Sequence, residues 1–177
     1  MRQSEQNVSA QSNEKRNAYV IEHITDSFLK LLVEKPIANI SISELTDLAG
    51  VGRASFYRNF KRKEDIITAY LNQLFIEWIN EFKNKKNVPL SEQVHTMIVH
   101  FENHRSFYTL LNEQGLTYML KDIIIGFCGP KPEYEIIQAY ASSFAAYTIY
   151  GWIDTWFQRG MRDSSDEIYE MFKQQGL

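Results

Sequence analysis

Five basic side chains are gathered in one short segment of an otherwise mildly acidic chain. Residues 53–63 contain Arg53, Arg58, Lys61, Arg62 and Lys63 and no acidic residue, whereas the whole chain of 177 residues has a net charge of −3. A concentrated cationic segment on an acidic protein is typical of a nucleic-acid site confined to one face. For an isolated charge run, a solvated turn is the alternative interpretation.

The first side chains of this segment have the chemistry needed to read DNA bases. Arg53 can donate two hydrogen bonds to O6 and N7 of a guanine, which is the commonest specific contact. Ser55 can reach a base or a phosphate, and Ala54 is small enough for close approach or for contact with a thymine methyl group. We therefore predict base contacts at these three positions.

Other polar residues near this segment are predicted to hold the DNA backbone. Phe56 and Phe60 are four residues apart and are expected to face a small core, which turns the side chains between them outward. Hydroxyl, guanidinium and ammonium groups are good phosphate donors. The predicted phosphate contacts are Ser41, Tyr57, Arg58 and Lys63.

Two short helices joined by a glycine turn are predicted to position these side chains. Ser41 and Glu44 form a capping box at the start of a helix over about residues 42–49. Gly50 stands where a helix ends in a left-handed turn, and a second helix follows over about residues 53–60. Short helices joined in this way are the helix-turn-helix signature.

The rest of the chain is also predicted to be helical, since its apolar residues recur at helical spacing without useful strand alternation. We expect an all-α protein of about nine helices, with a three-helix DNA-binding domain followed by a helical bundle. The expected domains are a disordered arm (1–14), the helix-turn-helix domain (15–62) and the C-terminal domain (63–177). The other expected helices cover about residues 16–34, 63–82, 90–103, 106–113, 116–126, 133–159 and 164–175.

The stretch ISISELTDLAGVGRASFYRNFKRKEDII resembles the tetracycline-repressor (TetR) family of bacterial transcription regulators. The shared pattern is a Thr or Ser cap, a short helix, Ala-Gly-Val, a recognition helix with Phe-Tyr or Leu-Tyr, and then Lys-x-Lys-Glu. The match spans about Arg16–Ile67, and the remainder matches in length, helical pattern and the YGWIDTWFQRGM segment. The resemblance implies a non-enzymatic repressor that binds double-stranded, pseudo-palindromic operator DNA as a homodimer, with a C-terminal domain that dimerises and often binds a small inducer.

Two positions depart from the family pattern. Gly52 stands where the family usually has Ser or Thr as the cap of the recognition helix, so one phosphate donor is lost. Asn59 stands where Tyr or His is common, and its amide can still bond a phosphate or an adenine. Asn59 is therefore included among the expected DNA contacts.

The C-terminal half offers apolar residues for a ligand pocket and for a dimer interface, although each of them could instead pack inside one subunit. The candidate pocket residues are Trp78, Phe82, Met97, Phe101, Phe107, Tyr108, Leu111, Tyr118, Met119, Tyr147 and Trp152. The candidate interface residues are Ala139, Ser143, Ala146, Ile149, Ile153, Trp156, Phe157, Ile168, Met171 and Phe172.

Enzyme, metal and membrane motifs are not evident in the sequence. His100 and His104 are four residues apart, but no further metal ligand is evident, and we expect no metal or cofactor. The polar start is no secretory signal and no segment is apolar enough to span a membrane, so we expect a cytoplasmic protein. Two alternatives stay open: a helical DNA-binding adaptor or architectural protein without an inducer, and a helical enzyme that carries a basic bend.

Overall fold

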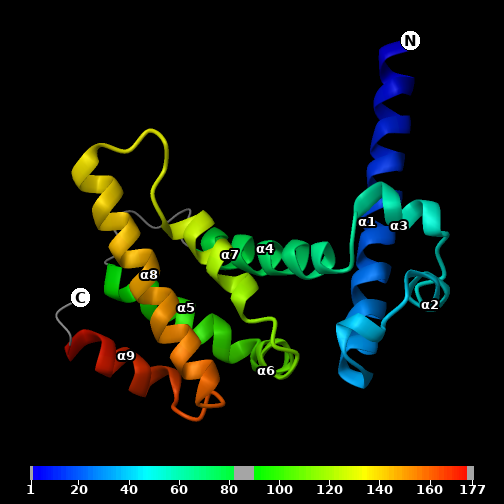
Figure 1. Cartoon of the computed structure of the whole chain (residues 1–177). Coiled ribbons are helices and arrows are strands. Elements are labelled where there is room, and N and C mark those ends of the chain that lie inside the picture. Colours follow the sequence, from blue (N-terminus) through cyan, green and yellow to red (C-terminus); the bar gives the residue numbers. More distant parts are fainter. Residues whose placement is uncertain (1, 82–89, 175–177) are drawn as a thin grey trace. The chain divides into compact units, whose positions relative to one another are not determined.

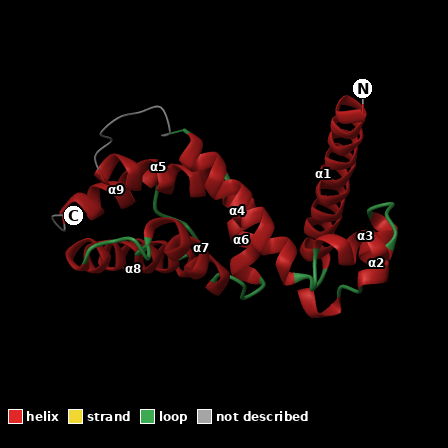
Figure 2. Ribbon diagram, turned by 90° about the horizontal axis from the view of Figure 1, so that it is seen from above, coloured by secondary structure: helices red, strands yellow, loops and turns green. Residues whose placement is uncertain are grey.

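The computed structural model describes residues 2–81 and 90–174, and within these ranges the chain is helical without a strand (Figures 1 and 2). The all-α prediction is therefore confirmed. The elements are α1 (Arg2–Glu34), the 3-10 helix η1 (Ile37–Asn39), α2 (Ile42–Leu48), α3 (Arg53–Asn59), α4 (Glu64–Asn80), α5 (Leu90–Asn103), α6 (Arg105–Glu113), α7 (Tyr118–Cys128), α8 (Ile136–Gln158) and α9 (Ser165–Gln174).

The chain divides into two compact units, Met1–Tyr70 and Leu71–Leu177. This boundary lies inside α4, eight residues later than the boundary at 62/63 expected from the sequence. Ile66 and Ile67 in the first turns of α4 are completely buried, and both belong to unit 1.

Unit 1 is built around one apolar face of α1. Ile24, Phe28 and Leu32, spaced four residues apart, are fully buried together with Leu45 of α2 and Phe56 of α3. This spacing places the three α1 side chains on one side of the helix. α1 contacts both α2 and α3, so its buried face is the support on which the two short helices rest.

α1 begins at Arg2, whereas we expected residues 1–14 to be disordered and the helix to start near residue 16. Residue 1 itself lies outside the described residues. The segment 2–14 contains neither proline nor glycine and includes two Glu, three Gln and one Ala, which favour helix. Its polar composition removes the apolar periodicity on which the prediction of a helix start depended.

Unit 2 has an aromatic core that joins its helices. The Phe101 and Tyr108 rings lie 4.5 Å apart between centroids, and Phe157 of α8 lies 5.6 Å from Phe101 and 5.5 Å from Tyr108. Trp156 is also buried and donates from Nε1 to the Asp163 carbonyl at 2.9 Å. Buried rings of this size dominate core energetics, so these side chains fix how α5, α6 and α8 pack.

α9 is attached to α5 by apolar and polar contacts. His95 stacks on Tyr169 with centroids 4.2 Å apart and lies 3.1 Å from Asp166 through Nε2. Ser165 donates from Oγ to the Glu102 carboxylate at 2.5 Å. None of the described helices is long and apolar enough to cross a membrane.

Candidate nucleic-acid interface

The turn between α2 and α3 has the geometry that the sequence predicted. Gly50 has a φ of +66°, in the left-handed region that favours glycine. The Val51 amide donates to the Thr46 carbonyl at 3.0 Å, and the Gly50 amide donates to the Asp47 carbonyl at 3.2 Å. These two bonds form a Schellman motif, which ends α2 and lets the chain turn into α3.

α3 has a buried face and an exposed face. Phe56 and Phe60 are buried, with ring centroids 5.7 Å apart. Arg53, Ala54 and Arg58 are exposed, and Tyr57 is 61% exposed. The predicted orientation of the helix is therefore confirmed, and it leaves Arg53 and Ala54 of the first turn open to a partner.

Ser55 and Asn59 are half-buried and bonded to each other along the helix. The Asn59 side chain donates from Nδ2 to the Ser55 carbonyl at 2.9 Å. One of the two amide N–H groups of Asn59 is therefore used inside its own helix. A contact of Asn59 with adenine or phosphate stays a prediction that uses its remaining groups.

Ser41 caps α2 as predicted and stays exposed. Its Oγ accepts a hydrogen bond from the Glu44 amide at 3.1 Å, which leaves the hydroxyl proton available for a phosphate. The Glu44 carboxylate accepts a bond from the Lys35 ammonium. That bond lowers the pKa of Glu44, helped by the charge of Lys35 and the Ser41 amide and opposed by burial.

Lys63 is half-buried, and its ammonium is bonded to backbone carbonyls. Its ammonium donates to the carbonyls of Ile37 at 2.5 Å, Ile40 at 2.6 Å and Ala38 at 3.4 Å. A lysine ammonium has three donors, and here all of them meet carbonyls of η1 or of the residue after it. In this structure Lys63 ties the start of α4 to η1, and its contact with phosphate stays a prediction.

Replacement of Lys63 by alanine is expected to lower the free energy of unfolding by about 1–3 kcal/mol, because the carbonyls lose a charged donor. Chemical denaturation measures this loss. The matched control is Lys61→Ala on the same turn, whose ammonium has no recorded partner within the described residues and whose loss is expected to change stability by less than about 0.5 kcal/mol. Unchanged stability of Lys63→Ala together with a flatter salt dependence of DNA binding would instead support a phosphate contact.

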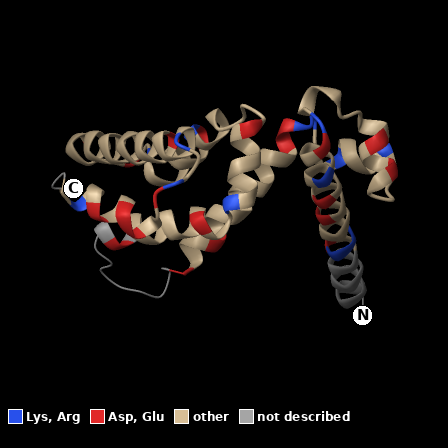
Figure 3. Ribbon diagram, turned by 90° about the horizontal axis from the view of Figure 1, so that it is seen from below, with Lys and Arg blue, Asp and Glu red and all other residues tan. Residues whose placement is uncertain are grey.

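Asp65 organises the basic turn between α3 and α4. Its carboxylate accepts bonds from the Lys61 amide at 2.8 Å and the Arg62 amide at 3.1 Å, and from Nε of Arg62 at 3.4 Å. Burial raises the pKa of Asp65, but these bonds outweigh that effect and lower it. In Figure 3 the Lys and Arg residues of this turn are blue. Within the described residues, the Lys61 ammonium and the exposed Arg58 have no recorded partner, so they are the cations best placed for phosphate.

Arg53 has a partner that sequence reasoning missed. Its guanidinium donates from Nη2 to Oγ of Ser43, the second residue of α2, at 2.8 Å. Ser43 lies ten residues away in the sequence, and a small polar residue in the first turn of α2 was the only available signal. The contact depends on how α2 and α3 cross, which residue spacing does not specify.

Unit 2 contains a partly open cavity of about 300 Å³ that is lined mainly by apolar side chains. Its walls come from α4, α5, α7 and α8, and a smaller cavity of about 170 Å³ adjoins it, sharing Val94, Ala145 and Ile149. Burial raises the pKa of the Cys128 thiol in the wall, although the Lys131 charge opposes the rise. The lining residues of the larger cavity are Trp78, Ile79, Val94, Met97, Phe127, Cys128, Ala145 and Ile149.

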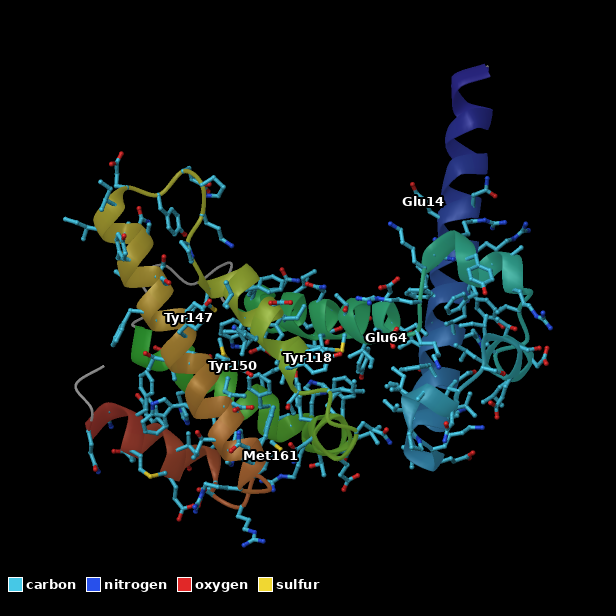
Figure 4. The ribbon with its side chains drawn as sticks, in the orientation of Figure 1. Glu14, Glu64, Tyr118, Tyr147, Tyr150 and Met161 are labelled. Carbon is cyan, nitrogen blue, oxygen red and sulfur yellow. The ribbon has the colours of Figure 1, made fainter. Side chains whose placement is uncertain are left out.

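Of the predicted pocket residues, Trp78 and Met97 line this cavity. Phe101, Tyr108 and Leu111 are completely buried core residues, and Trp152 lines a separate surface groove. Tyr118 of α7 and Tyr147 of α8 are exposed instead (Figure 4), and the Lys121 ammonium lies 5.5 Å from the Tyr147 ring centroid. Phe107 and Met119 are half-buried outside the cavity lining, and Phe82 lies outside the described residues.

Most of the predicted interface residues pack inside unit 2, and a different face of α8 is exposed. Ala146, Ile149, Ile153, Trp156, Phe157, Ile168 and Phe172 are buried, Ala139 and Ser143 are half-buried, and Met171 is exposed. The exposed apolar residues of α8, named here the α8 face, are between 51% and 85% exposed. They are Ile136, Ile137, Tyr140, Phe144 and Tyr147.

The His100 and His104 rings lie 4.6 Å apart between centroids. Among the described residues, however, no group of three or more His, Cys, Asp or Glu side chains could hold a metal ion. Nε2 of His100 is buried without a hydrogen-bond partner in the described part of the chain. Burial, together with the charge of His104, lowers the pKa of His100 to about 4, whereas Glu77 acts in the opposite direction.

This lowered pKa predicts a loss of stability in mild acid. The unfolded chain protonates His100 near pH 6.5 and the folded chain near pH 4. The unfolded state therefore binds more protons in that window, and stability falls by about 3 kcal/mol as pH drops through it. In chemical denaturation at pH 7 and pH 4.5, His100→Phe is expected to lose much of this pH dependence, and His104→Gln is expected to keep most of it because burial is the larger cause. An unchanged pH dependence in His100→Phe would contradict the assignment.

Comparisons with known proteins gave one match to a family model, within unit 1, and a similar solved structure over most of the chain. Residues 24–70 match the family described as bacterial regulatory proteins, tetR family, and this range contains all of α2, the glycine turn and α3. A crystal structure of a TetR transcriptional regulator from Streptococcus agalactiae 2603V has a TM-score of 0.60, at 17% identity over 92% of this chain and 96% of that chain. At this identity the likeness concerns the fold. No curated protein matches the chain.

Proposed function

We propose that the chain, whose residues 24–70 match the family of bacterial regulatory proteins, tetR family, is a sequence-specific transcriptional repressor. In this proposal it binds a pseudo-palindromic operator in the cytoplasm as a homodimer, and a small apolar ligand releases it. The single observation that carries the proposal is the pair of faces on α3. Buried Phe56 and Phe60 fix the helix, and exposed Arg53 and Ala54 stand in its first turn.

The proposed DNA contacts follow from the position of α3 as the second helix of a helix-turn-helix. Such a helix lies in the major groove and reaches base edges with its N-terminal residues. Arg53 reads a guanine, and Ala54 approaches a neighbouring base. Ser41, Tyr57 and Arg58 hold phosphates through a hydroxyl, a phenol and a guanidinium, and these contacts set the register of the helix.

The homodimer is proposed to form through the α8 face. A contiguous apolar surface on a helix marks a protein interaction site, since monomeric proteins rarely expose one. Ile137, Tyr140 and Phe144 recur at three- or four-residue spacing along α8, as a helix-pairing surface requires. A two-fold axis pairs this surface with itself, which gives an isologous interface.

The ligand is proposed to occupy the cavity of about 300 Å³ in unit 2. Its apolar walls suit an uncharged, largely apolar molecule. α4 supplies Trp78 and Ile79 to these walls, and its first residues belong to unit 1. A ligand that prefers one conformation of α4 would change DNA affinity by its differential affinity for the two states. An adaptor or architectural protein would show no such coupling.

Selection from a pool of random-sequence duplexes tests the proposed function. The purified protein is expected to enrich an inverted repeat, because two copies present the same reading helix to each half-site. Enrichment of one half-site without a repeat would contradict the homodimer, and no enrichment at all would contradict sequence-specific binding. A screen of apolar compounds against the enriched duplex then tests the ligand, since the adaptor alternative predicts that none releases the DNA.

A further inference from the structure

The contact between Ser43 and Arg53 joins α2 to the first residue of the reading helix. Nη2 of Arg53 donates to Oγ of Ser43 at 2.8 Å. The Ser43 hydroxyl lies 3.5 Å from Oδ2 of Asp47, one helical turn later on α2. A hydroxyl has one proton and two lone pairs. Ser43 can therefore donate to Asp47 while it accepts from Arg53, so the three side chains form a chain along the exposed surface.

We propose that Ser43 is a positioning residue for DNA readout. It holds the Arg53 guanidinium in an orientation that directs its remaining N–H groups at a guanine. This inference rests on the proposed function of α3. A guanidinium carries five N–H donors in a planar fork, and the bond to Ser43 uses one of them. The second N–H of Nη2 and those of its neighbours stay available for O6 and N7.

The physical advantage of this arrangement is preorganisation. A free arginine side chain on an exposed helix samples many rotamers, and binding DNA requires one of them. A side chain that is already held loses less conformational freedom when it binds, and such ordering is worth about 2- to 10-fold in affinity for one long side chain. The same restraint favours guanine. A guanidinium held in one orientation can bond both O6 and N7 of guanine, and it then discriminates against a base that offers only one acceptor.

A double-mutant cycle tests this role. The proteins are wild type, Ser43→Ala, Arg53→Ala and the double variant, and the probes are the duplex enriched by wild type and poly(dA-dT), which lacks the O6 and N7 acceptor pair of guanine. Ser43→Ala is expected to weaken binding to the enriched duplex about 2- to 10-fold and to leave binding to poly(dA-dT) unchanged. In the Arg53→Ala background the same change is expected to have no further effect, because Ser43 acts through Arg53.

Two further measurements separate positioning from folding. Ser43→Thr keeps the hydroxyl and is expected to retain wild-type binding. The midpoints of thermal unfolding of all five proteins should agree. Replacing the contacted guanine by 7-deazaguanine removes N7, and this change is expected to weaken wild type more than Ser43→Ala.

Three results would overturn the inference. The first is wild-type or tighter binding by Ser43→Ala, which would mean that the contact holds Arg53 away from DNA or does nothing. The second is an equal loss in both backgrounds, which would mean that Ser43 touches DNA itself. The third is absence of any enriched duplex for wild type, which would refute the proposed function as well, whereas the first two refute only the role of Ser43.

Discussion

Arg53→Ala is expected to lose about 5- to 150-fold in affinity for the operator, because a bidentate arginine–guanine pair is worth about 1–3 kcal/mol. Arg53 is exposed in the first turn of α3, and truncating it removes no core contact. Its effect should therefore appear in DNA binding and not in stability. Titration of the variant against operators with each base at the contacted position should show relaxed specificity at that position.

The matched control is Arg58→Ala on the same helix. Arg58 is exposed and is assigned to a phosphate, so its loss should weaken all DNA sequences about equally and reduce the salt slope by about 1. The two variants are thus expected to differ both in the type of their effect on DNA binding and in its size. Equal losses on operator and random DNA for Arg53→Ala would contradict the placement of α3 in the major groove.

Tyr140→Glu is expected to convert the protein from a dimer to a monomer. Tyr140 lies in the middle of the α8 face and is 77% exposed, so a monomer tolerates the change while an apolar interface does not. Sedimentation equilibrium should give a mass near the 20.8 kDa of one chain. Operator affinity should fall about 100-fold or more, since the two reading helices no longer bind as a linked pair.

Gln138→Glu is the control for the added charge. Gln138 is exposed on the same helix, about 100° around the axis from Ile137, and it lies off the line of the α8 face. This variant should remain a dimer and keep its operator affinity. A monomeric wild type, or a Tyr140→Glu variant that remains dimeric, would contradict the proposed interface.

Local sequence signals predicted α3 and the turn before it well. The capping box at Ser41 and the left-handed Gly50 each depend on residues within a few positions, and both have the expected geometry. Phe56 and Phe60 likewise fixed which face of α3 is buried. Lys63 and Ser43 were not predictable in this way, since their partners lie far away along the chain and are set by how the helices cross.

The C-terminal predictions were weaker because α8 carries apolar residues on all of its sides. Ile137 and Tyr140 are exposed while Ile149 and Ile153 are buried, although all are suited to a core. Periodicity identifies a buried face only when the other face is polar. The cavity was missed for a related reason. Ala145 and Cys128 line it, and side chains this small gave no signal.

The most direct test of the central claim, that α3 reads DNA sequence, is the ratio of two dissociation constants measured at one salt concentration. One is for the enriched duplex and the other for a scrambled duplex of the same base composition. The account predicts a ratio of about 1,000 or more, as specific DNA-binding proteins show. A ratio near one would mean that the basic segment binds only phosphate charge and that α3 reads no sequence.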